Sequence, residues 1–290
     1  EHTVHRYALT FYGRPAAELL VSLTADFTEL RRLLERRRAV LVPTRLMRVV
    51  AQFAGLMCAT LVRLDDQVAA RNWARTAKTV AHEAGDSKLH AWVLSQEAYS
   101  LYYGGDLVEA AYVAAQAQHV ARQAACPGVA ATAALEARIH ALYGRSKETH
   151  DALRRAGRAL AGLDAEARIA SPCGYNEAKF AHHMGNAFTQ LGRTAEAAAA
   201  QERALALHPK SDYHNRSLIM LDQADRLVRD DDPPAAAERA AQALRTADAV
   251  QRNPVVKLRA RQVLDRIPAN AAALPAAQEL RDLLHDAATH

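Results

Sequence analysis

The feature that most constrains the fold is a 32-residue segment, Ala178–Pro209, with small or turn-forming residues at fixed intervals. Counted from Ala178 as position 1, positions 8, 20 and 27 are small, position 15 is glycine and position 32 is proline. Two helices that approach closely need small residues where they cross, a turn residue between them and a residue that ends the second helix. The segment therefore predicts a helical hairpin, through Gly185, Gly192, Ala197, Ala204 and Pro209.

The same spacing occurs at four other places in the chain. The turn position falls at residues 65, 105, 144, 192 and 231, so the spacings are 40, 39, 48 and 39 residues. The longest interval contains Ile169–Gly174, in which Pro172 and Gly174 predict an extended loop. The three small positions of the five units are Cys58, Ala70 and Ala77; Ala98, Ala110 and Ala117; Ala137, Thr149 and Ala156; Gly185, Ala197 and Ala204; and Ala224, Ala236 and Ala243.

This pattern resembles the tetratricopeptide repeat (TPR), in which pairs of antiparallel helices stack into a solenoid. A TPR is about 34 residues long, so the helices here are expected to be about a turn longer. The resemblance implies an all-α fold, a right-handed TPR-like α-solenoid of about five helix pairs over residues 43–250. An alanine-rich helical protein can match a small-residue template by chance, but turn, alanine and length signals coincide five times here.

The two ends of the chain are expected to be caps that cover the open ends of the stacked core. In residues 1–42, mixed sequence broken at Gly13 and Pro15 precedes a helix expected from Asp26 to about Leu41. In residues 251–290, three prolines divide the sequence into short pieces before a polar helix from about Ala276; they are Pro254, Pro268 and Pro275.

Basic residues are concentrated in the first of these helices and just beyond it. The net charge of the chain is +5, and a basic helix can contact phosphates. Yet leucines form an apolar stripe beside the arginines, and no aromatic residue stands between them to stack on bases. We expect a solvated outer face; contact with a neighbouring domain or with nucleic acid stays open. The arginines are Arg31, Arg32, Arg36, Arg37, Arg38, Arg45 and Arg48.

No sequence motif indicates an enzyme, a metal site or a cofactor. The phosphate-binding loop, HExxH, G-x-S-x-G and dinucleotide signatures are absent from the sequence. Cys58, Cys126 and Cys173 are far apart and odd in number, which fits neither a zinc site nor a disulfide framework. His182 and His183 point about 100° apart on a helix, so they cannot chelate one metal. Without a signal peptide or an apolar run of about 20 residues, we expect a cytoplasmic protein.

Candidate ligand residues follow from the repeat frame, because in a TPR positions 2, 5, 9 and 12 of the first helix line the concave groove. Three aromatic residues fall on one stripe, suited to an apolar or planar ligand. Polar residues opposite suit a carboxylate or peptide carbonyls. Aromatic residues at helical spacing also pack between helices, so packing and groove lining both stay open. The candidates are Trp92, Ser95, Tyr99, Tyr102, Arg138, Lys179, His182 and Asn186.

Three of these candidates, Arg138, Lys179 and Asn186, are expected to be exposed to the groove. An asparagine at position 9 resembles the one that peptide-binding TPRs use to grip the backbone of their ligand. Only Asn186 fills that position, so the full carboxylate clamp of chaperone-binding TPRs is not reproduced.

A narrower resemblance comes from residues 71–121, with the run A-x-x-A-G-D-x-x-L-x-A-W at 81–92. This stretch resembles the region after the helix-turn-helix in actinobacterial regulators of the XRE type, which join a DNA-binding domain to a TPR-like sensor. The resemblance spans about residues 16–250. No helix-turn-helix is evident in the sequence, and the chain begins with Glu1 rather than methionine. We therefore expect residues in front of Glu1, or else a stand-alone TPR protein.

The resemblance implies the ligand- or peptide-sensing and protein-interaction domain of a cytoplasmic transcriptional regulator. An effector that prefers one of two solenoid curvatures would shift their balance. Peptide-pheromone receptors of firmicutes work in this way, so a peptide and a small molecule both stay open as effectors. We expect a homodimer, because DNA half-sites are paired, with DNA reached only through a separate N-terminal domain and no membrane partner. The alternative is a stand-alone TPR scaffold or adaptor that binds a protein partner.

Overall fold

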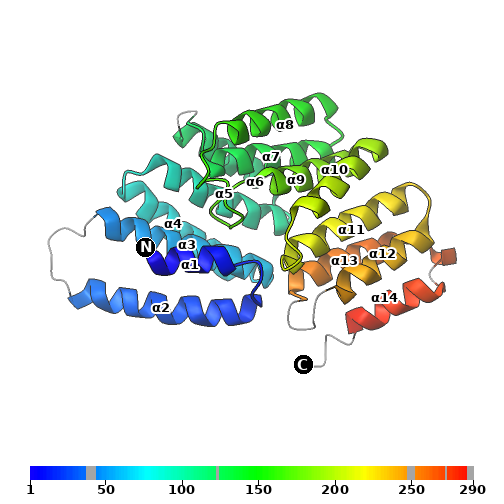
Figure 1. Cartoon of the computed structure of the whole chain (residues 1–290), viewed down its shortest axis with the longest axis horizontal. Helices are drawn as coiled ribbons and strands as arrows, with labels where there is room; N and C mark the ends of the chain where they lie inside the picture. The colour runs from blue at the N-terminus through cyan, green and yellow to red at the C-terminus, as the bar shows by residue number, and fades with distance from the viewer. Residues whose placement is uncertain (37–43, 122–123, 247–251, 272, 286–290) are drawn as a thin grey trace.

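The computed structural model confirms the all-α prediction. Within the residues that it describes (1–36, 44–121, 124–246, 252–271 and 273–285), every regular element is a helix and no strand occurs. Figure 1 shows the helices in chain order around a curved arrangement. They are α1 (His2–Thr10), α2 (Ala16–Arg36), α3 (Thr44–Arg63), α4 (Gln67–Glu83), α5 (Ser87–Tyr103), α6 (Leu107–Val120), α7 (Pro127–Leu142), α8 (Ser146–Ala161), α9 (Glu177–Gln190), α10 (Thr194–Leu207), α11 (Tyr213–Arg229), α12 (Pro233–Arg245), α13 (Pro254–Arg266), the short 3-10 helix η2 (Ala269–Ala271) and α14 (Pro275–His285).

Five consecutive pairs of helices pack tightly against each other: α3 with α4, α5 with α6, α7 with α8, α9 with α10 and α11 with α12. The turn of each pair falls at a position that the sequence predicts, and its residue has a left-handed backbone. The φ angles are 60° at Asp65, 85° at Gly105, 67° at Gly144, 69° at Gly192 and 61° at Asp231. Glycine adopts this conformation without a steric penalty, and aspartate tolerates it better than most residues.

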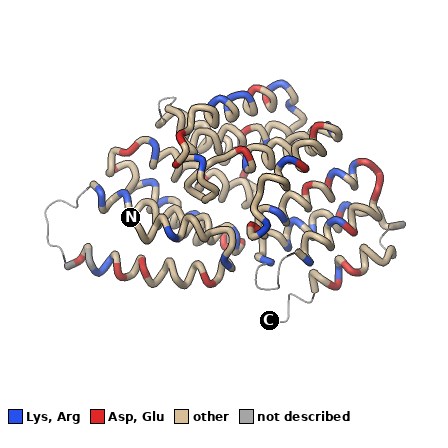
Figure 2. Tube along the Cα trace, viewed as in Figure 1, with Lys and Arg blue, Asp and Glu red and all other residues tan. Residues whose placement is uncertain are grey.

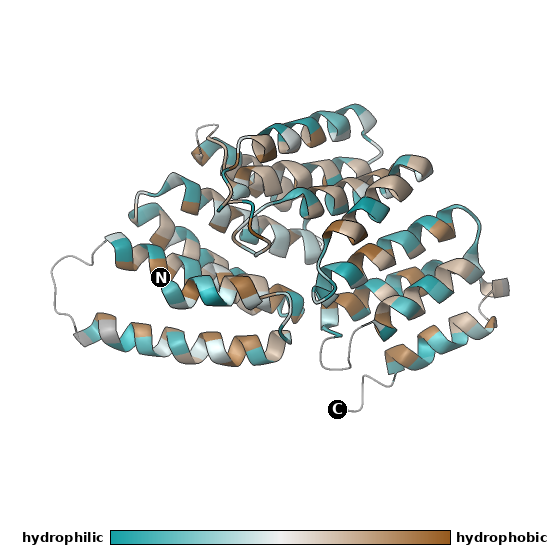
Figure 3. Ribbon diagram, viewed as in Figure 1, coloured by the Kyte–Doolittle hydropathy of each residue, from teal (hydrophilic) through white to brown (hydrophobic). Residues whose placement is uncertain are grey.

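The small residues of the repeat frame lie where the paired helices meet. All fifteen small positions are buried; the fourteen other than Gly185 are 0% exposed. A Cβ atom on Gly185 would lie only 2.8 Å from Cγ of Gln201 on the partner helix. In Figure 3, α7 is pale to brown along its length, whereas the peripheral α8 is largely teal. First helices therefore form the interior and second helices cover them.

The two ends of the helical array meet. The ring of Tyr12, after α1, stacks on the ring of His214 in α11, with centroids 6.3 Å apart and planes 4° apart. Arg63 at the end of α3 donates to the carbonyl oxygens of Phe11 (2.7 Å) and Arg14 (3.0 Å), which fixes this turn. α13 also contacts α3. The concave side is therefore closed across its mouth by the N-terminal segment.

The N-terminal helix begins ten residues earlier than predicted. α2 starts at Ala16, directly after Pro15, so Asp26 lies inside the helix rather than at its N-cap. Its carboxylate accepts a hydrogen bond from the hydroxyl of Tyr7 (2.6 Å), and residues 2–10 form a further helix, α1, that the sequence does not predict. The predicted start of the helix is wrong because the carboxylate of Asp26 binds Tyr7 of α1 instead of capping the N-terminus of a helix.

The basic face of α2 is solvated where the structure describes it. Arg31 pairs with Glu35 (3.3 Å) and Arg32 with Glu29 (3.5 Å), and all four side chains are more than half exposed. Figure 2 shows these opposite charges alternating along the helix. Exposed pairs of this kind contribute little to stability. Arg37, Arg38 and the predicted end of the helix, Leu41, lie outside the described residues. Arg45 and Arg48 belong to α3, where Arg45 pairs with Glu1 and Arg48 with Asp86 (3.1 Å).

Prolines set the boundaries of the C-terminal helices, as the sequence predicts. Pro254 is the first residue of α13 and Pro275 the first of α14, positions where the missing N–H has no helical partner. Asn253 caps α13 by accepting a hydrogen bond from the backbone N–H of Val256 (3.3 Å). Leu280 and Leu284 of α14 are buried in the same cluster as α12 and α13.

One described helix, α3, is long and apolar enough to cross a membrane by length and composition. Its most apolar window is 67% buried inside the structure, against α2, α4 and α5. α3 is therefore a core helix of this structure.

Two glycine-to-alanine substitutions separate backbone strain from side-chain packing. We expect Gly192→Ala to lower the free energy of unfolding by about 1 kcal/mol, because φ is +69° there and a Cβ meets no other atom within 4 Å. Gly157→Ala, inside α8, places its Cβ in ordinary contact 3.6 Å from Phe180 and should be neutral or stabilising, by up to about 1 kcal/mol. Urea denaturation measures both; equal effects would contradict the strain at Gly192.

Candidate ligand cavity

The loop between α8 and α9 enters the concave side of the helical array. Side chains that line the groove hold this loop in place by donating hydrogen bonds to its carbonyl oxygens. The indole N–H of Trp92 donates to the carbonyl oxygen of Pro172 (2.8 Å). Lys179 Nζ donates to Ser171 (2.6 Å) and Gly174 (2.7 Å). A Cβ on Gly174 would lie 2.2 Å from the carbonyl oxygen of Ile169, so this tight fold of the loop requires glycine. The predicted loop is thus folded into the groove and held there by three hydrogen bonds.

A cavity of about 130 Å³ remains between this loop, the N-terminal turn and the first helices of the pairs. Its walls come from α3, α5, α7, α9 and α11, which are far apart in the sequence. Six Phe, Tyr and Trp side chains, three histidines and two cations make up eleven of the 21 lining residues. The lining consists of Phe11, Tyr12, Ala59, Val62, Arg63, Trp92, Ser95, Gln96, Tyr99, Tyr103, Pro127, Ala131, Pro172, Gly174, Tyr175, Lys179, His182, His183, His214, Asn215 and Leu218.

An outer cleft of about 570 Å³ adjoins the cavity. It lies between α1, the start of α5 and the α8–α9 loop, and Trp92, Pro127 and Gly174 line both spaces. Trp92 is buried and packs directly over Gly55 of α3, where a Cβ would lie 2.4 Å from its ring. Trp92 therefore both packs between helices and separates the cleft from the cavity.

His183 is fixed on one side of the cavity by two phenol groups. Its Nε2 lies 3.1 Å from the hydroxyl of Tyr99 and its Nδ1 lies 2.9 Å from the hydroxyl of Tyr175. Burial, and then the charge of Arg138, hold the pKa of His183 well below its usual value, so the imidazole is neutral at physiological pH. Both ring nitrogens are in use, so this histidine positions the two tyrosines rather than offering a free ligand group.

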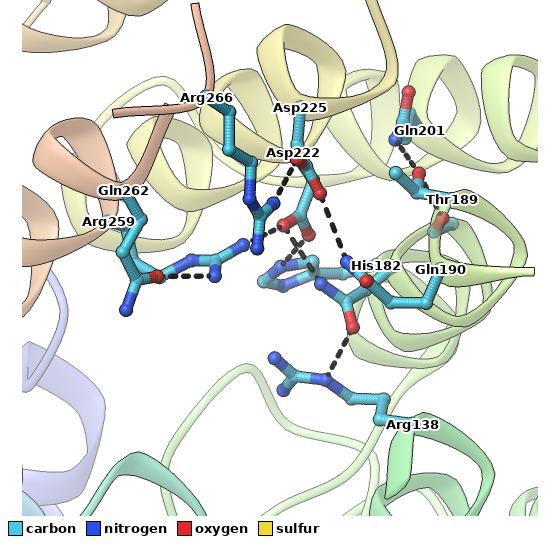
Figure 4. A network of polar contacts seen from close by, with 12 residues as sticks. Arg138, His182, Thr189, Gln190, Gln201, Asp222, Asp225, Arg259, Gln262 and Arg266 are labelled. Carbon is cyan, nitrogen blue, oxygen red and sulfur yellow. Dashed lines mark hydrogen bonds and ion pairs between the residues drawn. The ribbon is translucent and has the colours of Figure 1, made fainter. Parts of the chain in front are cut away.

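Beside the cavity, a polar network links three first helices and α13 (Figure 4). Arg138 of α7 donates from Nε to Oδ1 of Asn186 on α9 (2.9 Å). Asn186 donates to Oδ1 of Asp222 on α11 (2.9 Å), and Arg259 of α13 donates to the same oxygen (3.0 Å). The guanidinium of Arg138 also lies over the ring of Tyr102, 4.5 Å from its centroid. Asp222 is therefore the common acceptor of the network.

A second carboxylate extends the network toward the end of the array. Asp225 is contacted by Arg266 of α13, and its Oδ2 accepts a hydrogen bond from Gln190 of α9 (3.0 Å). Arg229 lies 3.6 Å from the same carboxylate. α13 is thus attached to α9 and α11 through charged groups as well as through apolar packing.

His182 connects the cavity to this network, because it lines the cavity and its Nε2 lies 3.4 Å from Oδ2 of Asp222. Burial lowers the pKa of His182, although Asp222 opposes that shift. Burial would raise the pKa of Asp222, but its contact with His182 and the charge of Arg259 outweigh burial and bring the value to about 2. A change at His182 is therefore felt by Asp222 and, through Arg259, by α13.

The eight predicted site residues divide into two groups. Five line the cavity: Trp92, Ser95, Tyr99, Lys179 and His182. The other three belong to the adjacent network: Tyr102, Arg138 and Asn186.

The exposure predicted for two of them differs from the structure. Arg138 is 4% and Asn186 2% exposed, and the amide of Asn186 is already bonded to Arg138 and Asp222, so neither presents a free group to an open groove. Lys179 is half-buried and does line the cavity. The difference arises because α11 and α13 bring Asp222 and Arg259 over these positions.

Several lining residues were missed by sequence reasoning. Tyr12 and Arg63 reach the cavity because the N-terminal turn folds across its mouth, and Tyr175 because the α8–α9 loop turns inward. No periodic signal marks them, because Tyr12 and Tyr175 lie outside the repeat frame and Arg63, at the end of α3, is not at one of its groove positions. His214 and Asn215 come from the first turn of α11, and their position follows from the curvature of the array.

Among the described residues, no group of three or more His, Cys, Asp or Glu side chains is placed to hold a metal ion. A scan against protein-family models gave no match, and a search of curated proteins found none with significant similarity. The arrangement of the cavity is therefore the basis for any statement about function.

We expect Asp222→Asn to lower the free energy of unfolding by about 3 kcal/mol at pH 7, because it leaves Arg259 without its buried countercharge. The pKa of Asp222 is lowered from 3.8 to about 2 in the folded protein, so its contribution is complete above pH 3.8 and is lost as the pH falls toward 2. The difference between wild type and variant should shrink over that range. Denaturation at several pH values measures it.

The matched control is Asp282→Asn, at an exposed position of α14, which should change stability by less than about 0.5 kcal/mol. A pH-independent difference for Asp222→Asn would mean that the lost charge is not the cause.

Proposed function

We propose that this chain is a TPR-type sensor domain that binds a small molecule in the cavity at its centre. One observation carries the proposal: the cavity is enclosed by five first helices, the N-terminal turn and the α8–α9 loop, and five of the eight groove residues expected from the repeat frame line it. Small-molecule sites are concave and lined mainly by apolar and aromatic side chains, with a few polar groups that orient the ligand.

The TPR assignment is supported by the turns and the helix contacts. Five turn residues with a left-handed backbone fall at the predicted intervals, and the small positions between them are buried where paired helices cross. α1, α2, α13 and α14 would then be the caps of a solenoid whose repeats occupy residues 43–250.

The size of the cavity favours a small molecule over a peptide. At about 130 Å³ it is comparable with the roughly 150 Å³ cavity that holds benzene in an engineered protein core. An extended peptide would have to displace the α8–α9 loop, which is held by Trp92 and Lys179 through three hydrogen bonds.

A ligand in the cavity would act on the helices at the two ends of the array, α1 and α13. His182 contacts Asp222, which accepts a hydrogen bond from Arg259 of α13. Tyr12, which directly follows α1, stacks on His214. A ligand that prefers one arrangement of these terminal elements shifts the balance by its differential affinity alone. The terminal elements are where an attached domain would be repositioned.

The regulator assignment rests on the resemblance to XRE-type proteins in residues 16–250. It implies a cytoplasmic homodimer that reaches DNA through a separate N-terminal domain. The reading frame upstream of Glu1 tests this directly. An in-frame helix-turn-helix supports a regulator, and its absence from the full gene favours the alternative, a stand-alone TPR scaffold or adaptor.

Filling the cavity should abolish ligand binding. Ala59 of α3 lines the cavity, so Ala59→Phe places a ring in the space. We expect phenol, indole and benzyl alcohol to include at least one compound that raises the Tm of the wild type in a saturable way. In the Ala59→Phe variant the compound should no longer raise the Tm in thermal denaturation. Calorimetry should show that its affinity for the compound is at least tenfold lower than that of the wild type.

The matched control is Ala199→Phe, at an exposed position of α10 away from the cavity, which should bind the same probe as the wild type does. Equal binding by Ala59→Phe would place the probe outside the cavity and contradict the proposal.

A further inference from the structure

The charge of the cavity is unbalanced. Two charged residues line it, Lys179 and Arg63, and no aspartate or glutamate is among its described lining residues. The terminal nitrogens of Arg63 are committed to the carbonyl oxygens of Phe11 and Arg14. Arg63 keeps N–H groups without a partner, its buried Nε among them, so both cations have capacity left for an anionic ligand.

Lys179 is held by neutral groups. Its ammonium donates to two backbone carbonyl oxygens, at Ser171 and Gly174, and lies 5.5 Å from the centroid of the Tyr12 ring. An ammonium has three N–H donors, so two hydrogen bonds leave one. No salt bridge joins Lys179 to a carboxylate in the described residues; the nearby Asp212 is bonded to His208 and Asn215 and caps α11. A cation that is partly removed from water and has no paired anion is unfavourable, and a ligand anion would reduce that cost.

The rest of the lining selects a flat ligand. The cavity is bordered by the rings of Tyr12, Trp92, Tyr99, Tyr103 and Tyr175, and its volume of about 130 Å³ suits one six-membered ring with a small substituent. Ser95 and Gln96 add polar atoms at the wall formed by α5.

We propose that the ligand of this cavity is a small planar organic anion, an aromatic or heteroaromatic monocarboxylate. Its ring lies among the tyrosines and Trp92, and its carboxylate pairs with the ammonium of Lys179. This inference rests on the proposed function and names the ligand class of the same site. The outer cleft, separated from the cavity by Trp92, Pro127 and Gly174, is its route of access.

The pH dependence of binding reports on Lys179. Burial lowers the pKa of its ammonium to about 8. The other titratable groups that face it keep one state between about pH 6 and 9. Burial raises the pKa of Cys173 to about 12 and raises that of Tyr12 further, the pKa of His183 is well below its usual value, and the pKa of Asp212 is lowered. An anion prefers the charged amine, so affinity is constant below pH 8 and falls above it.

The experiment compares benzoate with benzyl alcohol, a neutral molecule of nearly the same size, by isothermal titration calorimetry with the wild-type protein. We expect benzoate to bind at least tenfold more tightly at pH 7. Its dissociation constant should rise up to tenfold per pH unit above pH 8, whereas that of benzyl alcohol should stay constant.

The variant Lys179→Met keeps the length of the side chain and removes the charge. Because Lys179 also holds the α8–α9 loop, the readout is the ratio of the two affinities. We expect the variant to lose at least tenfold more affinity for benzoate than for benzyl alcohol, and residual benzyl alcohol binding also shows that it is folded. Lys147→Met, at an exposed position of α8, is the matched control and should bind both probes as the wild type does. The pH profile of the wild type tests the charge without any substitution.

The outcomes separate the two proposals. Equal affinity for benzoate and benzyl alcohol, or benzoate binding that survives Lys179→Met or ignores pH, overturns the anion assignment but leaves a small-molecule cavity. If neither benzoate nor benzyl alcohol, and none of the other ring probes, binds the wild type, the proposed function itself is wrong.

Discussion

The close approach of the two helices in each pair is the constraint on which the rest of the structure depends. At three positions per pair the helices meet through alanine or a residue of similar size, and a larger side chain there would push them apart. Because the paired helices cannot separate, first helices are kept on the inside, and their inward residues converge on one place. The cavity and the polar network are built on that convergence.

The concave side does not remain an open groove, because two irregular segments occupy it. Trp92 and Lys179 bind carbonyl oxygens of the α8–α9 loop, and Arg63 binds carbonyl oxygens of the N-terminal turn. Backbone carbonyls buried in a groove need donors, and these three side chains supply them. An interior surface that could hold an extended chain is thereby reduced to a small cavity with aromatic walls and an unbalanced positive charge.

The polar network beside the cavity explains how the interior communicates with the terminal helices. Asp222 of α11 accepts hydrogen bonds from Asn186 of α9 and Arg259 of α13, and it lies beside His182. One carboxylate therefore connects three helices. Removing Asp222 or Arg259 would leave the other charge buried without compensation, which makes the arrangement sensitive to what occupies the cavity. The apolar clusters between the same helices stabilise their packing, and the polar network fixes the position of α9, α11 and α13 relative to one another.

Local sequence was sufficient for the helices, the turns and the small contact positions, because each depends on spacing within one helix pair. It was sufficient also for the inward position of Trp92, Ser95, Tyr99, Lys179 and His182, since helical periodicity fixes which residues share a face. The burial of Arg138 and Asn186, the start of α2 and the part played by Tyr12, Arg63 and Tyr175 depend on segments that are distant in the chain. Sequence alone determined an all-α chain with an aromatic and basic interior stripe, and only the tertiary structure decided that this stripe encloses a small cavity, because its closure depends on contacts between the two ends of the array.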